Sequence, residues 1–282
     1  MRKVRIGFLL PHYSCRSKSL MPSVVQTLAE DGAVVDVVHP IEHMVDLSAV
    51  RVEHDLYVLR RWGGLALSMA GALHQLGATM VNHYPATAAL RDKIVTARIL
   101  QAAGVPTPLS CIGMDAGQLA PMLDGGPIIV KPYTGGNGQR IQIIRTPDEL
   151  AQVDCRGEPA FAQRYYPHDG RDRKIYVIGD LVFGVKKIFP RSTEEDKYGE
   201  PFTLTPEMHD IALRCGRAFG IDLYGVDIIE SDGMPYVVDM CSIPGFKGVP
   251  NAVGLLARYF RAAAERAARG QPISGVAATV DL

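Results

Sequence analysis

The sequence predicts two structural parts, a small parallel α/β domain followed by a larger α+β region. The chain has 282 residues, which is enough for about two domains of ordinary size. Strand-like and helix-like segments alternate over roughly the first 85 residues, as in a parallel sheet covered by helices on both faces. Beyond them, many short apolar strands are separated by only a few turn residues, as antiparallel hairpins require.

The α/β domain is expected to contain four strands and two helices. Val24, Val25 and Leu28 recur at helical spacing, and Gly32 is placed to end that helix. The second helix is expected over 65–76, where Gly77 closes it. The expected strands are 4–10, 34–38, 55–59 and 78–81, of which 34–38 has the composition of a buried strand. The glycines after the first strand do not spell GxGxxG, so a dinucleotide site there has weak support.

The α+β region is expected to combine helices with hairpins. A helix over 91–103 would place Ile94, Val95, Ile99 and Leu100 on its inner side, before Gly104 stops it. Thr205 predicts the N-cap of a helix that ends at Gly220, and 251–269 predicts an amphipathic surface helix packed on the domain. Strands are expected at 127–131, 141–144, 160–163, 174–178, 181–185, 225–229 and 236–240.

Charge and cysteine usage exclude several classes of protein. The 30 basic residues balance the 30 acidic residues, so no global positive field favours nucleic acid or anionic lipid. The five cysteines are widely spaced and contain no CxxC pair, which favours a reducing, cytoplasmic location. The short apolar run after the basic N-terminus ends at Pro11, too early for an export signal. We therefore expect neither a nucleic-acid nor a membrane partner.

A glycine-rich loop follows a strand that ends in a lysine. The glycines allow backbone N–H groups to converge on an anion, and Lys131 on the preceding strand could reach phosphate oxygens. This arrangement suits a nucleoside triphosphate, although a flexible hairpin with a solvated lysine fits the loop equally well. The loop consists of Thr134, Gly135, Gly136, Asn137 and Gly138.

Two aspartates near the other end of the chain favour the nucleotide site. Asp227 and Asp239 lie on strands joined by a turn around Gly233. If the hairpin closes with a three-residue loop centred on Gly233, the two carboxylates face each other about 5 Å apart. Two such carboxylates repel unless a cation lies between them, and oxygen ligands favour Mg²⁺ or Mn²⁺. The alternative is an aspartate paired with an arginine.

A further hairpin is predicted to turn at Gly179 and Asp180. A two-residue loop would put Asp172 opposite Lys187 and Lys174 opposite Val185, all on one face of the sheet. Two lysines and an aspartate on one face fit an anion-binding surface. Taken alone, the pattern favours a solvated edge with a weak surface salt bridge.

Six segments, in this order along the chain, resemble the ATP-grasp superfamily, within it the group around RimK-type ligases and the related inositol polyphosphate kinases. They are RDKIVTARILQAAGVPTP, PIIVKPYTGGNGQ, AQRYY, KIYVIGD, TPEMHDIALRCGRAFGIDLYGVDII and VVDMCSIPGFKGV. The resemblance covers most of the chain and implies a Rossmann-like pre-ATP-grasp domain at 1–87, followed by an ATP-grasp domain at 88–282. The latter would divide into a central subdomain (88–162) and a metal-binding subdomain (163–282).

The resemblance also implies roles for residues at matching positions. Lys93 and Lys131 match the two ATP-phosphate lysines, and residues 135–138 match the mobile loop above the phosphates. Asp227 and Asp239 match the two metal-binding carboxylates, and Lys174 and Lys187 match basic positions near the γ-phosphate or the acceptor. The hinge whose backbone contacts adenine would consist of Gln163, Arg164, Tyr165 and Tyr166. The ribose ligand would be Asp169.

One position departs from the family's pattern. Where the family usually has asparagine two residues after the second carboxylate, this chain has Cys241. A thiol is a poor ligand for Mg²⁺. The departure implies a second metal held weakly or through water, or a small buried side chain that fills the asparagine site.

Three functions are compatible with these residues. The leading one is an ATP-dependent carboxylate–amine ligase that forms an amide or peptide bond through an acyl phosphate, with Mg²⁺ or Mn²⁺ as cofactor. The second is a small-molecule kinase with a hydroxyl acceptor, and the third is a nucleotide-binding protein without catalysis. The partners of the first would be small-molecule or peptide carboxylates and amines, and the oligomeric state stays open, a homo-oligomer included.

The sequence gives only weak indications of which residues contact the substrate. Ligands of open α/β sheets gather beyond the C-terminal ends of the strands. Arg60 and His12 each follow a strand in this way, and Gly245 belongs to the PGFKGV stretch. These three residues are the candidates for substrate contact, with an interdomain salt bridge as the alternative for Arg60.

Overall fold

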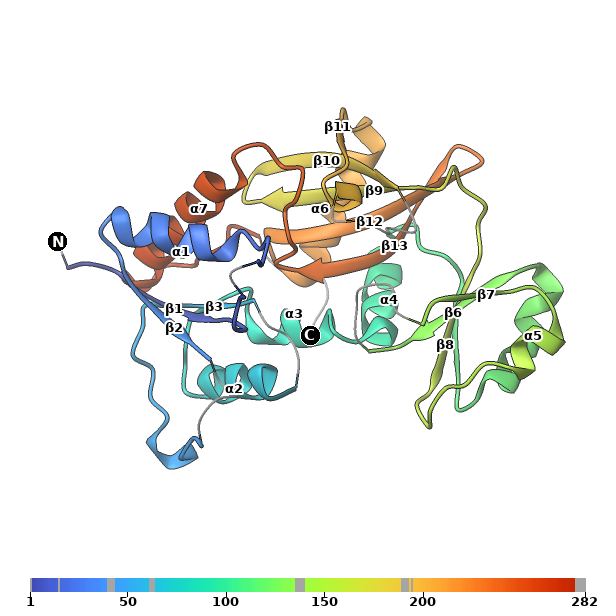
Figure 1. Cartoon of the computed structure of the whole chain (residues 1–282), viewed down its shortest axis with the longest axis horizontal. Coiled ribbons are helices and arrows are strands. Elements are labelled where there is room, and N and C mark those ends of the chain that lie inside the picture. The colour runs from blue at the N-terminus through green and yellow to red at the C-terminus, as the bar shows by residue number, and fades with distance from the viewer. Residues whose placement is uncertain are drawn as a thin grey trace.

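The chain folds into three sheets that are covered and joined by helices (Figure 1). The computed structural model describes residues 2–14, 16–39, 44–60, 64–134, 140–188, 193 and 195–276. One sheet is parallel and the other two are antiparallel, which confirms the predicted combination of an α/β part and an α+β part.

The N-terminal sheet has the parallel topology that the alternation of strands and helices predicts. Its order is β2 (Val34–Val38), β1 (Arg5–Leu9), β3 (Leu56–Leu59) and β4 (Met80–Val81). Helices α1 (Met21–Glu30) and α2 (Gly64–Gln75) and the short 3-10 helix η1 (Leu47–Ala49) connect the strands. The prediction that β2 is buried is wrong, since Val37 and Val38 are 40% and 38% exposed. The exposure of β2 follows from its position in the sheet, because β2 is an edge strand and lacks a neighbouring strand on one side.

The central sheet forms a separate lobe, seen at the right of Figure 1. Its order is β5 (Ser110–Gly113), β8 (Ala160–Arg164), β6 (Ile128–Pro132) and β7 (Gln142–Ile144). The 3-10 helix η2 (Ala116–Gly125) and the short helix α5 (Pro147–Ala151) cover it. A core of its own, which includes Leu119, Ile128 and Leu150, holds this lobe together.

The third sheet is the largest of the three and is built from antiparallel hairpins. Its order is β11 (Glu200–Phe202), β10 (Leu181–Ile188), β9 (Arg171–Ile178), β12 (Leu223–Ser231) and β13 (Met234–Ser242). The 3-10 helix η3 (Glu195–Lys197) precedes β11, and helix α6 (Pro206–Phe219) packs on the sheet. Thr205 caps α6 by accepting a hydrogen bond from the Met208 N–H, and Gly220 ends it in the left-handed conformation, both as predicted.

Helices α3 (Tyr84–Ala89) and α4 (Lys93–Ala102) connect the N-terminal sheet to the central lobe. The sequence analysis missed α3, whose six residues are too few to show a helical period. For α4 the predicted inner face is partly wrong. Val95 is 41% exposed, whereas Thr96 and Ala97 are buried with Ile99 and Leu100.

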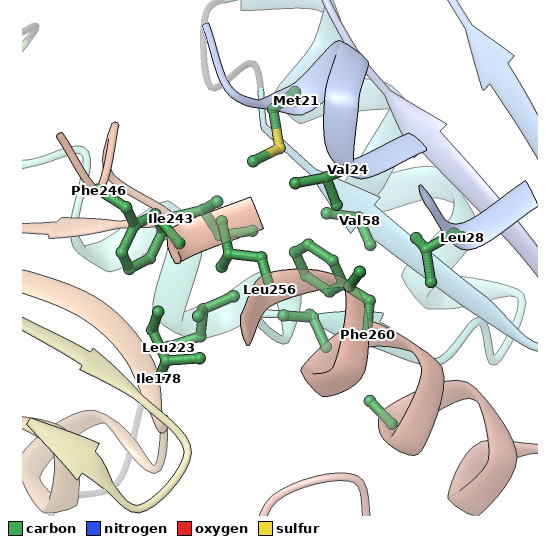
Figure 2. Packing of buried hydrophobic residues seen from close by; sticks show 14 of the residues in the cluster. Met21, Val24, Leu28, Val58, Ile178, Leu223, Ile243, Phe246, Leu256 and Phe260 are labelled. Atoms are coloured by element: carbon green, nitrogen blue, oxygen red, sulfur yellow. The ribbon is translucent and has the colours of Figure 1, made fainter. Parts of the chain in front are cut away.

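Helix α7 (Ala252–Ala267) returns from the end of the chain to pack beside α1. Its Phe260 is fully buried and meets Phe8 of β1 edge to face, with ring centroids 5.6 Å apart. Figure 2 shows the resulting core, in which Val58 of β3, Leu223 of β12 and Leu256 of α7 surround the same space. One core therefore joins the first and the last segments of the chain.

Across the part of the chain that the structure describes, no helix combines the length and the apolar character that crossing a bilayer requires.

Candidate active site

Asp227 and Asp239 are direct partners in the β12–β13 ladder, as the sequence predicts. Lys174 of β9 is paired with Asp227 from the other side, so the three charged residues form a row across three neighbouring strands. Because paired residues of antiparallel strands project from the same face, the row gathers one ammonium group and two carboxylates.

The predicted three-residue loop is wrong, and a bulge produces the pairing instead. The hairpin closes with the two-residue turn Asp232–Gly233, in which both residues have positive φ. The register then slips by one position between Ile228 and Asp227, where Val238 is the extra residue of β13. The turn alone would have placed Val238 opposite Asp227, so the bulge brings the carboxylates together.

The Lys174 ammonium lies 2.6 Å from Asp227 Oδ1. Burial alone would lower the pKa of Lys174, but the Asp227 carboxylate, with smaller contributions from Cys241 and Tyr176, raises it above its usual value. Lys174 therefore stays charged. The same Oδ1 atom is buried and accepts no hydrogen bond of normal geometry from the described residues.

Lys131 reaches the same place from the central lobe. Its Nζ donates a hydrogen bond of 3.0 Å to the carbonyl oxygen of Val238, the bulged residue. Burial lowers the pKa of Lys131 to about 8, an effect that the Asp239 carboxylate opposes and the Lys93 ammonium reinforces. Burial also lowers the pKa of Lys93.

The start of α4 is tied to the end of β6, which places Lys93 near Lys131. Asp92 caps α4 by accepting hydrogen bonds from the N–H groups of Ile94 and Val95, and the Lys93 N–H donates to the Tyr133 carbonyl oxygen. Lys93, Lys131, Gln163 and Asp239 line a narrow cavity of about 20 Å³ between the two antiparallel sheets. Gly135, Gly136, Asn137 and Gly138 of the glycine-rich loop lie outside the described residues.

The predicted hinge connects the two antiparallel sheets, and the side chains of Arg164 and Gln163 make structural contacts in it. Arg164 donates a hydrogen bond of 2.7 Å to the Met122 carbonyl oxygen and another to Gly126, which fixes the end of η2. Gln163 donates to Ser110 Oγ, and the Tyr165 N–H donates to Pro127. Adenine binding by this segment stays a prediction.

The outer end of the hinge contacts the β12–β13 hairpin. Tyr166 stacks on Tyr236 of β13, with ring centroids 4.3 Å apart. Asp169 accepts two hydrogen bonds from Arg173 and lies 3.3 Å from Lys186. The hydrogen bonds from Arg173 hold the pKa of Asp169 well below its usual range. These ion pairs account for the position of Asp169 without a nucleotide, and its ribose contact stays a prediction.

The hairpin that turns at residues 179 and 180 has the predicted register, with Asp172 opposite Lys187 and Lys174 opposite Val185. The solvated-edge interpretation is wrong, because Asp172 is 8% and Lys187 is 4% exposed. Lys187 Nζ donates 2.8 Å to the Tyr176 hydroxyl and 3.2 Å to the Lys247 carbonyl oxygen. Lys187 thus supports the segment after β13, and a direct catalytic role for it stays a prediction.

The donors at this site fit a divalent oxygen-loving ion. Asp227 and Asp239 present carboxylates from paired positions, and one of their oxygens, Asp227 Oδ1, is buried beside the Lys174 ammonium. Cys241 does not complete a three-ligand set, because no group of three histidine, cysteine, aspartate or glutamate side chains suited to a metal occurs among the described residues. Burial raises the pKa of the Cys241 thiol, which favours the neutral thiol over the thiolate form that binds metals.

Two of the three predicted substrate residues share a larger cavity. Arg60 and Gly245 line a space of about 480 Å³, whereas His12 is absent from its lining and stacks on His39 at 3.8 Å. The sequence analysis missed Arg16, Lys18 and Lys247, which line the same cavity. The signal that could have found the first two is their place in the segment between the first strand and the first helix, at the edge where ligands of parallel sheets collect.

Comparisons with known proteins show which family the chain belongs to. Residues 90–258 match the family described as the RimK-like ATP-grasp domain. The chain is 27% identical to a ribosomal protein bS6–L-glutamate ligase of Escherichia coli, over 86% of this chain and 88% of that protein. It is 26% identical, with the same coverage, to a probable alpha-L-glutamate ligase of Citrobacter koseri.

Solved structures share the fold. A RimK domain ATP-grasp protein from Sphaerobacter thermophilus has a TM-score of 0.72 at 18% identity and covers 90% of this chain and 98% of its own. D-cycloserine synthetase DcsG has a TM-score of 0.73 at 18% identity, with 93% and 99% covered. These likenesses confirm the ATP-grasp fold. Since the family match extends over more than half of its length and includes both aspartates and the three lysines around them, the chain belongs to the RimK-like ATP-grasp family.

Proposed function

We propose that this protein is an ATP-dependent carboxylate–amine ligase whose reacting groups meet beside Asp227 and Asp239. The observation that carries the proposal is the row of Lys174, Asp227 and Asp239 with Lys131 donating into the same strand. Membership of a family that includes curated glutamate ligases supports the same reaction class.

The reaction divides into two balanced steps. An oxygen of the substrate carboxylate attacks the γ-phosphorus of ATP, the bond from that phosphorus to the bridging oxygen breaks, and ADP leaves. The amine nitrogen then attacks the acyl carbon, the bond from that carbon to the phosphate oxygen breaks, and the nitrogen loses a proton. The products are an amide, ADP and phosphate, and no protein nucleophile is needed.

The protein contributes position and charge to both steps. Lys93 and Lys131 bind the phosphates of ATP, and Lys174, held charged by Asp227, faces the oxygens of the transferring group. Asp227 and Asp239 would hold Mg²⁺ or Mn²⁺, which neutralises phosphate charge when bound. The loop 135–138 is proposed to cover the phosphates, and the segment from Gln163 to Tyr166 is proposed to contact adenine.

Isotope transfer tests this proposal. The protein is incubated with ATP, Mg²⁺ and a panel of unlabelled amines and carboxylates whose carboxyl oxygens carry ¹⁸O. We expect one carboxylate and one amine to give an amide, ADP and phosphate that carries ¹⁸O. Hydroxylamine in place of the amine should give a hydroxamate. A stable phosphorylated product that forms without any amine would instead support a kinase and contradict the ligase.

Two substitutions in one hairpin give a matched comparison. Asp239→Asn removes a carboxylate from the row and should lower kcat by about 100-fold or more, because removal of one electrostatic contact to the transition state typically costs that much. Asp232→Asn changes an exposed turn residue of the same hairpin and keeps a side chain that tolerates its positive φ. Equal activity of the two variants would contradict the role assigned to Asp239.

A further inference from the structure

Lys131, which is proposed to bind ATP phosphates, has an aromatic neighbour on its own sheet. Phe161 of β8 is the direct partner of Lys131 of β6 in the antiparallel ladder. The two strands lie side by side in the central lobe (Figure 1). Because paired residues project from the same face, both side chains reach the narrow cavity between the two antiparallel sheets, and both line it.

The ammonium group of Lys131 lies over the ring of Phe161. Its Nζ atom is 5.7 Å from the ring centroid, within the distance of about 6 Å at which the negative face of an aromatic ring attracts a cation. Lys131 is 9% exposed and Phe161 is 2% exposed, so both partners are shielded from water. Desolvation strengthens a cation–π contact, and the ring therefore stabilises the charged form of Lys131 inside the protein.

A second contact holds the same ammonium group from the opposite sheet. Lys131 Nζ donates a hydrogen bond to the carbonyl oxygen of Val238, the bulged residue of β13. A lysine ammonium group has three N–H donors. The carbonyl oxygen accepts from one and the ring face attracts a second, so the third can donate to a phosphate oxygen in the cavity.

The ring matters because a lysine side chain is difficult to order. Lysine is among the residue types that lose most rotamer freedom when they are fixed. A single hydrogen bond to a carbonyl oxygen offsets only part of that loss, because it replaces a hydrogen bond to water. With the ring as a second contact, the ammonium group is in place before ATP arrives, and ATP binding then does not have to order it.

We propose that Phe161 is a positioning residue for ATP binding, whose ring face holds the Lys131 ammonium group where the phosphates of ATP bind. The inference rests on the proposed role of Lys131 in binding ATP, and it assigns to Phe161 a contact with the lysine rather than with the nucleotide. An aliphatic side chain at residue 161 could fill the same space, but it would offer the charge no attractive face. The electronic character of the ring, and not its volume alone, should therefore set the affinity for ATP.

Fluorinated phenylalanines at residue 161 test the role of the ring face. One, two and three fluorine atoms progressively weaken the negative potential of the face and change the size of the ring little. In calorimetry with ATP and Mg²⁺ at pH 7, the Kd of ATP should rise with each fluorine and reach at least three times its unmodified value with three.

The same replacements at Phe260, which lies in the core around α7, are the control and should leave the Kd of ATP unchanged. A Kd that stays the same, or falls, across the series at Phe161 would overturn the proposal. Urea denaturation of each protein checks that the fluorine atoms leave the fold intact.

A double-mutant cycle shows whether the ring acts through the lysine. Phe161→Leu should weaken ATP binding at least threefold in the unmodified protein and should have no effect in the Lys131→Met background. If the ring instead stacked on adenine, Phe161→Leu would weaken binding equally in both backgrounds, and that result would contradict the role assigned to Phe161.

Steady-state kinetics separate this inference from the proposed function. The protein with three fluorine atoms at Phe161 should show a KM for ATP at least threefold higher and an unchanged KM for the carboxylate substrate. If the Kd of ATP follows the fluorine series but no carboxylate and amine are joined, the ligase proposal fails and the role of Phe161 stands. If ligation occurs while neither the Kd nor the KM of ATP responds to the series, the inference about Phe161 fails alone.

Discussion

Lys131 illustrates how one residue can serve both the fold and the chemistry. Its side chain is 9% exposed and its ammonium group donates to the carbonyl oxygen of Val238, so it joins the central lobe to β13. Burial lowers its pKa to about 8, which brings its titration close to neutral pH. If Lys131 binds ATP phosphates as proposed, part of the positive charge for that binding is lost when the pH of the free protein rises past this pKa.

Nucleotide affinity should fall above pH 8. Below that pH Lys131 is already protonated in the free protein, and binding takes up no proton at this site. Above it the free protein has a neutral lysine, while bound phosphate raises the pKa, so binding must take up a proton. The dissociation constant of ATP should then rise by up to about tenfold per pH unit. Calorimetry between pH 7.5 and 9.5, in buffers with different heats of ionisation, measures both the affinity and the proton uptake.

A variant with a permanently charged side chain is the control for this titration. Lys131→Arg should lose most of the pH dependence, because arginine stays protonated throughout the range. What remains would report Lys93, whose pKa burial also lowers. An ATP affinity of the unmodified protein that does not change between pH 7.5 and 9.5 would contradict the titration assigned to Lys131.

At the scale of an element, the β12–β13 hairpin shows why opposed residues cannot be counted from a turn alone. The Asp-Gly pair at 232 and 233 is a strong signal for a two-residue turn, and the structure has that turn. An extra residue at Val238 then restores the pairing of the aspartates and presents its carbonyl oxygen to Lys131. The bulge depends on partners distant in sequence, so the local sequence contains no signal that predicts it.

Helix α6 offers an element-scale prediction in which two effects compete. Gly216→Ala in a helix interior normally stabilises by about 1 kcal/mol through propensity. Here the new Cβ would lie 2.7 Å from the ring of Tyr224 and closer still to its hydroxyl, which donates to the Ala212 carbonyl oxygen. Overpacking in a core typically costs about 1–3 kcal/mol, so the free energy of unfolding should fall and the Tm with it. Urea denaturation of both proteins measures the difference.

A double-mutant cycle identifies the cause. Tyr224→Phe removes the hydroxyl that the new methyl group would meet, so Gly216→Ala should cost less in the Tyr224→Phe background than in the unmodified protein. An equal cost in both backgrounds would show that the contact between the two side chains does not decide the effect.

On the scale of the whole molecule, α7 unites parts that the sequence separates. The core that α7 completes contains residues of the N-terminal sheet and of the third sheet, whereas the central lobe has a core of its own (Figures 1 and 2). The boundary predicted near residue 87 therefore does not divide the buried contacts, because residues 252–267 pack on α1 and β3. The two-part division stays a prediction about sequence organisation.

Phe260→Ala should loosen both joined parts together. Loss of a fully buried phenylalanine typically costs about 3–5 kcal/mol. Native-state hydrogen exchange followed by mass spectrometry should show faster exchange in β1, β3 and β12, with little change in β6 and β8 of the central lobe. Ile128→Ala, in the core of the central lobe, is a control with the opposite pattern. Exchange that rises equally in all three sheets after Phe260→Ala would contradict separate cores.

The sequence by itself determined the local features of this protein. Most strands and the larger helices, the cap at Thr205, the hairpin register of β9 with β10 and the identity of Asp227, Asp239 and Lys131 as site candidates follow from signals within about 15 residues. Lys93 became a candidate only through the family resemblance. These signals are strong because hydrogen-bonded turns, caps and apolar periods depend on near neighbours.

Tertiary structure decided whatever depends on distant neighbours. It alone exposed β2 as an edge strand, buried Lys187 under the segment after β13, and placed Arg16 and Lys18 in one cavity with Arg60 and Lys247. Burial and electrostatic fields are sums over atoms that the fold brings together, and the chain order does not contain those sums. The residue types therefore indicated the chemistry of the site, whereas the protonation states and the burial of its side chains depend on tertiary packing.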